Sequence, residues 1–429
     1  MQRLLHASKP EPKFWAISVS GATITLRTGP MHTPGTTRTI ECKSDEAALK
    51  TAEAMVEQRL RDGFTVASQA PDAPAAAIDE AAERALLTDD PAGWLVFADS
   101  LLETTERLRG ELIGLQVRAA RRERGTITKA KDFISTHFDA LVGPKLAAWH
   151  KQVTIDWQYG YARVVKLWSG PHSAPLAAPL DALMQSPACR FLQRVEFGSP
   201  GNEGRYDTAL RALVKLDWPR HLDALYLGNF DVEAAAEADS AWPRMESLAA
   251  LTPKADRLRS LEVRAALNTF GKGLSFPKLE RLALRPTAFD GRLMTDLLTL
   301  VAPRLHTFDV QCPTPSGGWA ALRHVLQPWL AVGQLTTLVL RHDDGVMDLL
   351  ESLGESLTKL EAVELVGSVH ADEVARLRRL APLLAQAKLT VVPSIATKLG
   401  KSFPKVVGEE LPKPKRRPAR RERYWSVYE

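Results

Sequence analysis

One apolar pattern recurs along the second half of this chain and constrains its fold more than any other feature. The pattern is Leu-x-x-apolar-x-apolar, and its seven copies begin at Leu192, Leu222, Leu258, Leu279, Leu305, Leu335 and Leu360. The alternating apolar residues that end each copy predict a short strand, and the helical periodicity between copies, as over residues 319–330, predicts helices. One strand and one helix cannot bury both faces of the strand, so the units are expected to stack.

Two further segments extend the predicted stack at its ends. Residues 154–157 and 164–167 are expected to form strands that lead into it, and residues 388–392 to form an eighth strand that closes it. The pattern resembles the leucine-rich-repeat family, which implies an α/β solenoid over residues 132–393, with a parallel sheet inside and helices outside. The usual Asn or Cys of that family is replaced in every copy, by Pro200, Phe230, Ala266, Thr287, Pro313, Asp343 and Ser368. We therefore expect an irregular solenoid.

The stacked strands are expected to carry two rows of charged residues. Equivalent positions of neighbouring parallel strands lie roughly 5 Å apart, and the residues on either side of the last apolar position should face the inner side. The partner-binding surface predicted from these rows consists of Tyr226, Glu262, Arg264, Arg285, Asp309, Gln311, Arg341 and Glu364. Because the acids and arginines should largely neutralise each other, the pattern favours a protein partner of mixed charge. The alternative is a charged surface without a partner.

The first 66 residues show a different pattern. Residues 14–19, 22–26 and 36–42 are strand-like, and a helix is expected from Ser44 to residue 63. With Trp15, Gly29, Gly35, Gly63 and Phe64, this order resembles the WGR domain. In DNA-binding members of that family, the Trp and Arg of the naming tripeptide contact DNA, whereas this chain has Thr28-Gly29-Pro30. The resemblance implies a small α+β interaction or packing module over residues 1–66.

A linker and a helical segment are expected next. Residues 67–79 are rich in Ala, Pro and Ser, as is typical of a linker. Residues 80–131 contain the motifs Phe97-Ala98-Asp99-x-Leu101-x-Glu103 and Arg109-Gly110-Glu111-Leu112-Ile113. They resemble the repeat-companion domain of bacterial multidomain proteins, for which no catalytic function is known. Asp99 and Glu103 have the spacing of a carboxylate pair on one helix face. A local pair between Asp99 and an arginine such as Arg109, with a solvated Glu103, is the favoured interpretation.

The net charge of +5 comes from the end of the chain. Residues 401–429 contain nine basic and four acidic side chains, which leaves 47 of each in the other 400 residues. Residues 394–429 are expected to form a disordered basic tail. Two clusters could contact phosphates, namely Arg118, Arg121, Arg122 and Arg124, and, in the tail, Lys413, Lys415, Arg416, Arg417, Arg420, Arg421 and Arg423. They make nucleic-acid binding an alternative function; docking of the tail on an acidic protein, or no specific partner, also remains open.

The sequence lacks the motifs of the common enzyme classes. It has no Gly-rich phosphate loop followed by Lys-Ser or Lys-Thr, no nucleophile elbow and no His-Glu-x-x-His. The His342-Asp343-Asp344 cluster favours a turn over a metal site, and the three cysteines are far apart. No stretch approaches the roughly 18 apolar residues of a membrane span. We expect a non-enzymatic, cytoplasmic protein-interaction scaffold with no cofactor, metal, small-molecule substrate or membrane association.

Overall fold

The chain folds into two compact units, residues 1–150 and 151–429. The computed structural model describes residues 2–6, 13–30, 36–62, 64–66, 86, 90–102, 104–170, 173–228, 243–287, 289, 291–311, 318–342, 345–367, 371–400, 402–403, 405–408 and 425–427.

The N-terminal unit begins with an antiparallel sheet of five strands. The strands are β1 (Gln2–His6), β2 (Lys13–Ser20), β3 (Thr23–Pro30), β4 (Thr36–Glu41) and β5 (Thr65–Val66). Their spatial order is β4-β3-β2-β1-β5. The sequence predicted β2, β3 and β4, whereas β1 and β5 were not predicted. Gly21, with a φ of 60°, makes the tight turn between β2 and β3.

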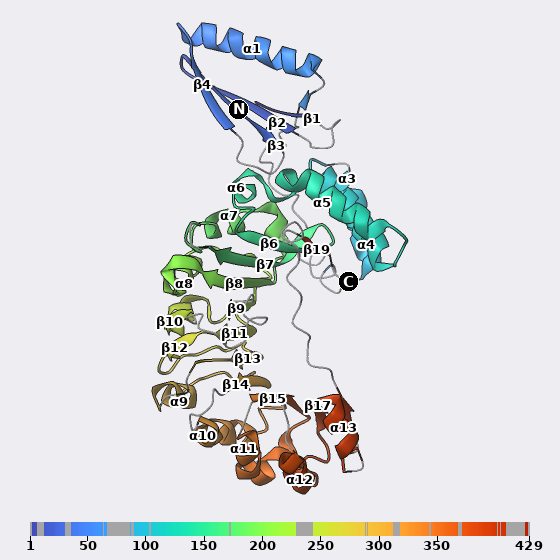
Figure 1. The fold of residues 1–429 in the computed structure, drawn as a ribbon, viewed down its shortest axis with the longest axis vertical. Coiled ribbons are helices and arrows are strands. Elements are labelled where there is room, and N and C mark those ends of the chain that lie inside the picture. The colour runs from blue at the N-terminus through green and yellow to red at the C-terminus, as the bar shows by residue number, and fades with distance from the viewer. Residues whose placement is uncertain are drawn as a thin grey trace. The chain divides into compact units, whose positions relative to one another are not determined.

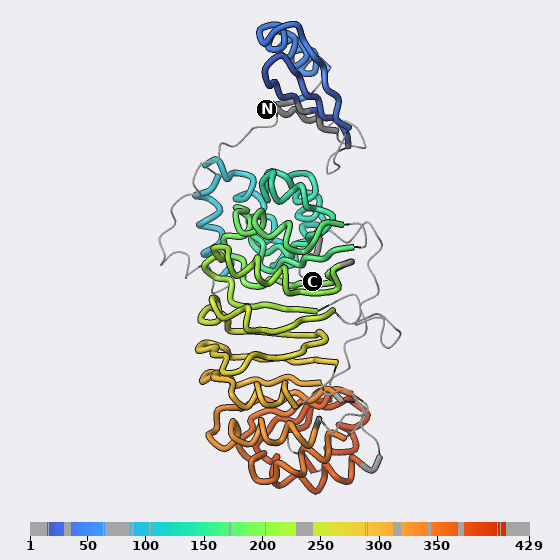
Figure 2. Tube along the Cα trace, turned by 90° about the vertical axis from the view of Figure 1, so that its left-hand side faces the viewer, coloured from blue at the N-terminus to red at the C-terminus, as the bar shows by residue number. Residues whose placement is uncertain are grey.

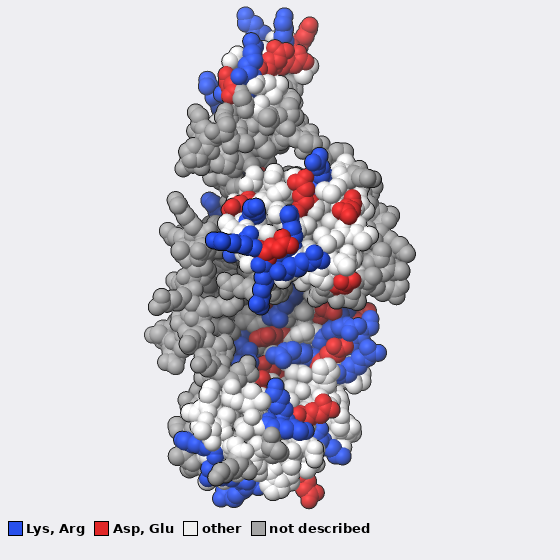
Figure 3. All heavy atoms as spheres, turned by 90° about the vertical axis from the view of Figure 1, so that its right-hand side faces the viewer, with Lys and Arg blue, Asp and Glu red and all other residues white. Residues whose placement is uncertain are grey.

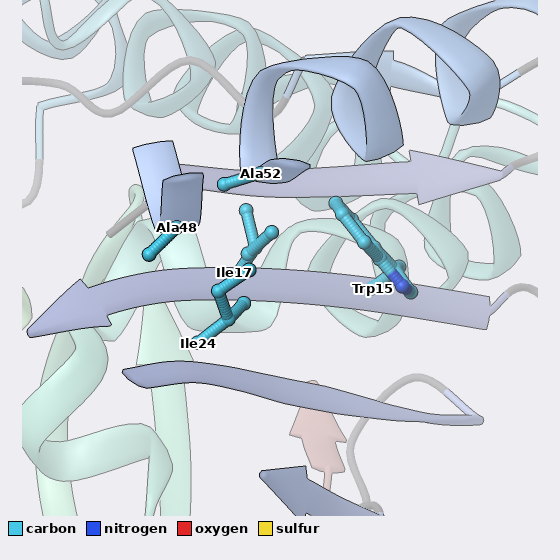
Figure 4. Close-up of a cluster of buried hydrophobic side chains, with 5 residues drawn as sticks. All are labelled: Trp15, Ile17, Ile24, Ala48 and Ala52. Atoms are coloured by element: carbon cyan, nitrogen blue, oxygen red, sulfur yellow. The ribbon is translucent and has the colours of Figure 1, made fainter. Parts of the chain in front are cut away.

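One helix packs against this sheet. Helix α1 (Asp45–Arg61) begins as expected after Ser44, whose hydroxyl accepts a hydrogen bond of 3.2 Å from the Ala47 amide. The helix and the sheet share a small core of buried side chains, which Figure 4 shows in contact across the two layers: Trp15, Ile17, Ile24, Ala48 and Ala52. The alanines let the helix approach the sheet closely, and the strands supply the bulk of the apolar volume.

The other described elements of the N-terminal unit are helices. They are α3 (Pro91–Leu102), α4 (Arg107–Ala120), α5 (Thr126–Val142) and the single turn α6 (Pro144–Ala147). Helices α3 and α4 cross at Gly110, where a Cβ atom would lie 2.7 Å from the Ala98 carbonyl oxygen. The boundary that the sequence placed after residue 131 falls inside α5, because the helical part continues through α6.

The arginine of the second helical motif is a structural residue. Arg109 is buried, forms an ion pair of 3.0 Å with Glu106, and donates a hydrogen bond of 2.9 Å to the Leu141 carbonyl oxygen. It therefore ties α4 to the end of α5. Asp99 is exposed, and the contacts described for Arg109 are with Glu106 and Leu141, so the expected pair between Asp99 and Arg109 is not found among them. Glu103 lies outside the described residues.

The second unit is α/β and is built on one large, mostly parallel sheet (Figure 1). Its strands are β6 (Val153–Gln158), β7 (Tyr161–Ser169), β8 (Arg194–Pro200), β9 (Ala224–Gly228), β11 (Ser260–Arg264), β13 (Arg281–Leu284), β14 (Thr307–Gln311), β15 (Thr337–His342), β16 (Ala362–Gly367), β17 (Lys388–Val391), β18 (Val406–Gly408) and β19 (Trp425–Val427). From β6 to β18 they lie side by side in chain order, and only the hairpin β6–β7 is antiparallel. The predicted strands at 154–157, 164–167 and 388–392 are β6, β7 and β17.

Short helices and a second, two-stranded parallel sheet connect the strands of this unit. The sheet pairs β10 (Arg244–Ser247) with β12 (Ala266–Thr269). The α-helices are α7 (Leu180–Met184), α8 (Asp207–Leu213), α9 (Gly291–Leu298), α10 (Gly318–Ala331), α11 (Val346–Leu353), α12 (Ala371–Leu380) and α13 (Pro393–Leu399). The 3-10 helices are η1 (Pro187–Phe191), η2 (Gly201–Glu203), η3 (Leu248–Lys254) and η4 (Gly354–Lys359). Figure 1 shows α8, α9 and α10 on one side of the large sheet, and none of the described helices of this unit is drawn on the other side of strands β8 to β14.

The repeated apolar pattern forms the core of this unit. The three apolar positions of every copy are at most 2% exposed. Pairing between strands aligns the second position of each copy with that of the next, from Val195 through Leu225, Leu261, Leu282, Phe308 and Leu338 to Val363. Figure 2 shows the resulting stack of parallel rungs. The pattern in the sequence therefore predicted both the strands and their register.

A repeated backbone hydrogen bond joins the turns that precede the strands. The Gln193 carbonyl accepts hydrogen bonds from the amides of Asp223 and Ala224, at 3.1 Å each. The same two-donor arrangement recurs at the carbonyls of Asp223, Arg259, Glu280, His306 and Thr336. This ladder pairs backbone groups that would otherwise lack partners in each turn.

A buried carboxylate closes the turn that follows β12. Asp296 on α9 accepts hydrogen bonds from the Thr269 hydroxyl and from the amides of Phe270 (3.0 Å) and Gly271 (3.1 Å) at the end of β12. Burial alone would raise the pKa of Asp296, but these hydrogen bonds outweigh it, so the pKa lies below its ordinary value.

The ordered sheet continues past the boundary that the sequence placed at residue 393. Helix α13 and strand β18 lie within the segment expected to be a disordered tail, and β18 extends the sheet by pairing with β17. At the other end of the sheet, β19 pairs in parallel with β6. The prediction of a tail without structure from residue 394 was therefore wrong for α13, β18 and β19.

Candidate functional site

The predicted charged rows lie in register on the face of the large sheet opposite to its apolar core. Strand pairing aligns Glu196, Tyr226, Glu262, Ala283, Asp309, Val339 and Glu364 in one row. In the adjacent row, Arg264 stands next to Gly228, and Gln311 next to Arg341. The alignment expected from the apolar pattern is thereby confirmed.

Asp309 is the deepest charged group of this face. Its side chain is 0% exposed and contacts arginines of two neighbouring strands. Arg341 of β15 donates hydrogen bonds to both carboxylate oxygens, at 2.8 and 3.1 Å. Arg281 of β13 lies 2.9 Å away, and Arg285, just after β13, lies 3.8 Å away. A carboxylate this deeply buried would be costly alone, and the surrounding guanidinium groups compensate for its lost hydration.

A continuous series of ion pairs extends from Asp309 toward the N-terminal end of the sheet. Arg285 pairs with Glu262 (3.0 Å), and Glu262 also contacts Arg194 of β8 (3.8 Å). Arg194 pairs with Glu196 at 2.8 Å within the same strand. We call this series, together with Lys166 and Asp156, which are described next, and with the arginines around Asp309, the charged face.

The series ends at the hairpin β6–β7. Lys166 of β7 lies 3.8 Å from Glu196 and 3.5 Å from Asp156 of β6. The charged face therefore crosses eight adjacent strands from β6 to β15. At about 4.8 Å per strand, this corresponds to about 34 Å.

The remaining predicted residues are not equally accessible. Tyr226 is 4% exposed and lies below the guanidinium of Arg194, which is 5.5 Å from the ring centroid. Its hydroxyl occupies space beside Gly228, where a Cβ atom would be only 2.7 Å away. Arg264, Gln311 and Glu364 are half-buried. Three of the eight residues predicted for the partner-binding surface, Tyr226, Arg285 and Asp309, are buried.

Burial and neighbouring charges shift the titration of Glu196. Loss of hydration is the largest effect and raises the pKa of Glu196. Lys166 and Arg194 oppose it by favouring the ionised form, whereas Asp156 and Glu262 raise the pKa further. The net result is a pKa of Glu196 above the ordinary value of a glutamate.

Sequence reasoning missed three basic members of the charged face, Lys166, Arg194 and Arg281. Arg194 and Arg281 are both the first residues of their strands, aligned across the sheet two residues before Glu196 and Ala283. The alternation of a strand places residues two apart on the same face. Extending the rows backwards by two residues would have found these arginines. Lys166 lies opposite Glu196 in a strand that has no copy of the apolar pattern.

The predicted basic cluster of the helical segment is brought together at one turn. Arg118 lies near the end of α4, and Arg121, Arg122 and Arg124 lie between α4 and α5; all four are exposed. Arg118 donates a hydrogen bond of 3.2 Å to the Gly114 carbonyl oxygen. Within the described part of the chain, no ion pair involves any of the four. The seven basic tail residues, Lys413 to Arg423, lie outside the described residues.

Other candidate features give no assembled site. Asp343 and Asp344 of the histidine cluster fall outside the described residues. Among the residues with described positions, no three His, Cys, Asp or Glu side chains gather as metal ligands would. None of the described helices combines the length and the apolar character needed to cross a bilayer.

Comparisons with known proteins give only distant likenesses. No protein-family model matches the sequence, and no curated protein matches it. A structural-genomics target from Bacteroides fragilis is similar over 96% of this chain and 98% of its own, with 14% identity and a TM-score of 0.48. Human 5T4, also called trophoblast glycoprotein or Wnt-activated inhibitory factor 1, is similar over 62% of this chain and 89% of its own, with 14% identity and a TM-score of 0.26. Neither likeness supports an argument about function.

Proposed function

We propose that this protein is a non-enzymatic interaction scaffold of the cytoplasm whose charged face binds another protein. In this proposal, the second unit is an irregular leucine-rich-repeat-like solenoid. The first 66 residues are a WGR-like module, and helices α3 and α4 belong to a repeat-companion domain. The observation that carries the proposal is the unbroken series of ion pairs from Asp156 to Arg341 on the sheet face opposite to α8, α9 and α10.

The geometry of this face suits recognition of a protein. Long arginine side chains lose conformational entropy when a partner immobilises them, which reduces affinity. Here the carboxylates of Glu196, Glu262 and Asp309 already hold the arginines before any partner arrives. Figure 3 shows Lys and Arg atoms interleaved with Asp and Glu atoms over the part of this face that is drawn in colour. A preorganised surface about 34 Å long could bind a partner without a deep pocket.

Site-specific crosslinking tests the proposal. A photo-crosslinking amino acid is placed at Gln311 on the charged face or, as the control, at Val332, which follows α10 and is 76% exposed. We expect a defined protein to crosslink to position 311 and not to position 332. The same protein, once identified and purified, should bind the native chain directly. Equal crosslinking from the two positions, or no direct binding, would reject the charged face as the binding surface.

Nucleic-acid binding is the second candidate function, and the exposed turn between α4 and α5 favours it. Four arginines without an ion pair in the described structure are available there for phosphate contacts. The test is a salt series with a labelled duplex. Changing Arg121 and Arg124 to Gln should lower the slope of log affinity against log salt by about 0.9 for each lost contact. Arg107→Gln is the control, because Arg107 is on α4 and is already paired with Glu111.

The contribution of the tail to nucleic-acid binding needs its own variant. A full chain in which the seven basic tail residues are changed to Gln keeps both β18 and β19, whereas a chain that ends after Gly408 would lose β19 and its pairing with β6. Loss of salt-dependent binding in this variant would assign the phosphate contacts to the tail. An unchanged slope in both sets of variants would remove the nucleic-acid function from consideration.

A further inference from the structure

The charged face contains both acidic and basic side chains, but the acidic ones lie deeper than most of the basic ones. The carboxylates are the less exposed members, with side-chain exposures of 0% for Asp309, 13% for Glu196, 14% for Glu262 and 16% for Asp156. The cations are more exposed, at 24% for Arg341, 32% for Lys166, 33% for Arg194 and 40% for Arg281. Arg285, at 10%, is the exception. A partner would therefore meet cations first.

This difference in depth determines which partner charge fits. A guanidinium has five N–H donors in a planar fork, and the carboxylate beneath occupies only the inner ones. The outer donors of Arg194, Arg281 and Arg341 remain able to bind an incoming anion without breaking the inner pairs. A cationic partner would have to pass these groups to reach the acids, at the cost of like-charge repulsion.

From this arrangement, we infer that the partner bound by the charged face presents an acidic polypeptide segment whose carboxylates contact Lys166, Arg194, Arg281 and Arg341. The inference rests on the proposed function and specifies the chemistry of its partner. Arginine recognises a carboxylate through two parallel hydrogen bonds, which suits this pairing. About ten residues of extended chain would cover the 34 Å of the face.

A polypeptide fits this face better than a single-stranded nucleic acid does. Binding of single strands combines a cationic groove with exposed aromatic rings on which bases stack. In the described rows of the charged face, the aromatic residue is Tyr226, which is buried below Arg194. The face thus offers charge without a stacking platform.

The test measures binding of labelled poly-L-glutamate to the full chain. One variant combines Lys166→Gln, Arg194→Gln and Arg281→Gln, the three most exposed cations of the face. Arg341 is left intact, because it holds the buried Asp309. The matched control combines Arg205→Gln, Arg376→Gln and Arg379→Gln, which removes the same charge from the same unit at residues that also pair with carboxylates.

The expected result is a loss of affinity of about tenfold in the face variant, because each exposed ion pair contributes a factor of about two to three. The control variant, with the same net charge and the same tail, should bind as the native chain does. Circular dichroism spectra that match that of the native chain show that both variants are folded.

Three outcomes would overturn the inference. The first is equal affinity of the face and control variants for poly-L-glutamate. The second is a face-dependent affinity that is greater for oligodeoxythymidylate than for poly-L-glutamate. The third is face-dependent binding of poly-L-lysine, which would leave the charged face as a protein-binding surface and reject only the acidic partner. Failure of the proposed function itself has a different signature, the absence of crosslinks specific to position 311.

Discussion

Arg341 donates two hydrogen bonds from the neighbouring strand to the fully buried carboxylate of Asp309, with Nε 2.8 Å from Oδ1 and Nη2 3.1 Å from Oδ2. This two-point contact fixes the plane of the carboxylate. Arg281 then approaches the Oδ2 atom from the strand on the opposite side, at 2.9 Å. Three adjacent strands, β13, β14 and β15, are therefore joined by side chains as well as by backbone hydrogen bonds.

We predict that Asp309→Asn destabilises the second unit by about 3–5 kcal/mol, because it leaves three guanidinium groups without the charge that compensates them. The measurement is the free energy of unfolding in urea. Asp348→Asn is the control, since Asp348 pairs with Arg376 while 73% exposed and should change stability by no more than about 1 kcal/mol. If the two substitutions cost the same, Asp309 is not the anchor of the charged face.

Replacing either of two glycines of α4 by alanine should change the stability of the protein, and the two changes should be in opposite directions. A Cβ atom on Gly110 would lie 2.7 Å from the Ala98 carbonyl oxygen of α3, so Gly110→Ala should push the helices apart and cost about 1–3 kcal/mol. A Cβ atom on Gly114 meets nothing within 4 Å. Gly114→Ala should therefore stabilise the helix by up to about 1 kcal/mol. Thermal unfolding of both variants checks the packing of α3 on α4, and a shift of the same sign in both would refute it.

Asp296 should contribute stability that depends on pH. Its pKa is lower in the folded chain than in the unfolded one, so its contribution is present above the ordinary value of about 3.9 and is lost as the pH falls through the lowered pKa. Asp296→Ala leaves the amides of Phe270 and Gly271 without their acceptor and should cost about 2–3 kcal/mol at pH 7. Urea unfolding at several pH values should show a smaller acid destabilisation in the variant. A parallel pH dependence in both chains would show that folding does not lower the pKa of Asp296.

Glu196 should make the charged face sensitive to pH. Its raised pKa means that protonation begins at a higher pH than for an ordinary glutamate, and it removes a negative charge between Lys166, Arg194, Asp156 and Glu262. Binding of poly-L-glutamate should therefore strengthen as the pH is lowered from 7 to about 5, above the range in which most of the ligand's own carboxylates, with pKa values of about 4.3, are protonated. Glu196→Gln should bind more tightly at pH 7 and lose most of this dependence. An identical pH profile in both chains would exclude Glu196 as its origin.

The contribution of Glu196 to stability should depend on pH in the opposite direction from the contribution of Asp296. A carboxyl group whose pKa is raised by folding favours the folded state most at pH values below its unfolded pKa, and this advantage is lost as the pH rises through the folded pKa. The same urea series therefore separates the two residues.

The apolar pattern of the sequence was sufficient to predict the seven strands of the second unit that carry it, and their register. Every copy places its three apolar residues at the core, and a residue such as Asp309 must then fall on the opposite face because strand side chains alternate. The depth of Asp309 was not predictable in the same way. It depends on Arg281, Arg285 and Arg341, which cover it from outside its own strand. The periodicity of one strand does not indicate which side chains from other strands will do this.

Other features were missed for different physical reasons. Strand β1 has an apolar pair, Leu4 and Leu5, but its place depends on pairing with β2, a non-local contact. Arg109 was expected to pair with a neighbour on the preceding helix, whereas the fold turns it toward Glu106 and the end of α5. Strand β19 follows a basic, proline-containing segment whose composition is typical of disorder. The strand was missed because it depends on pairing with β6, which is far away in the sequence.

The most direct measurement is the affinity of the crosslinked and purified partner for the native chain and for Arg281→Glu, with Arg379→Glu as the control. Arg281 is 40% exposed on the charged face, whereas Arg379 is 70% exposed on α12 and pairs with Glu351. We predict that charge reversal at Arg281 weakens binding by about tenfold or more, since it replaces an attraction by a repulsion, and that the control leaves the affinity unchanged. Equal affinities of all three chains would contradict the assignment of the charged face as the binding surface.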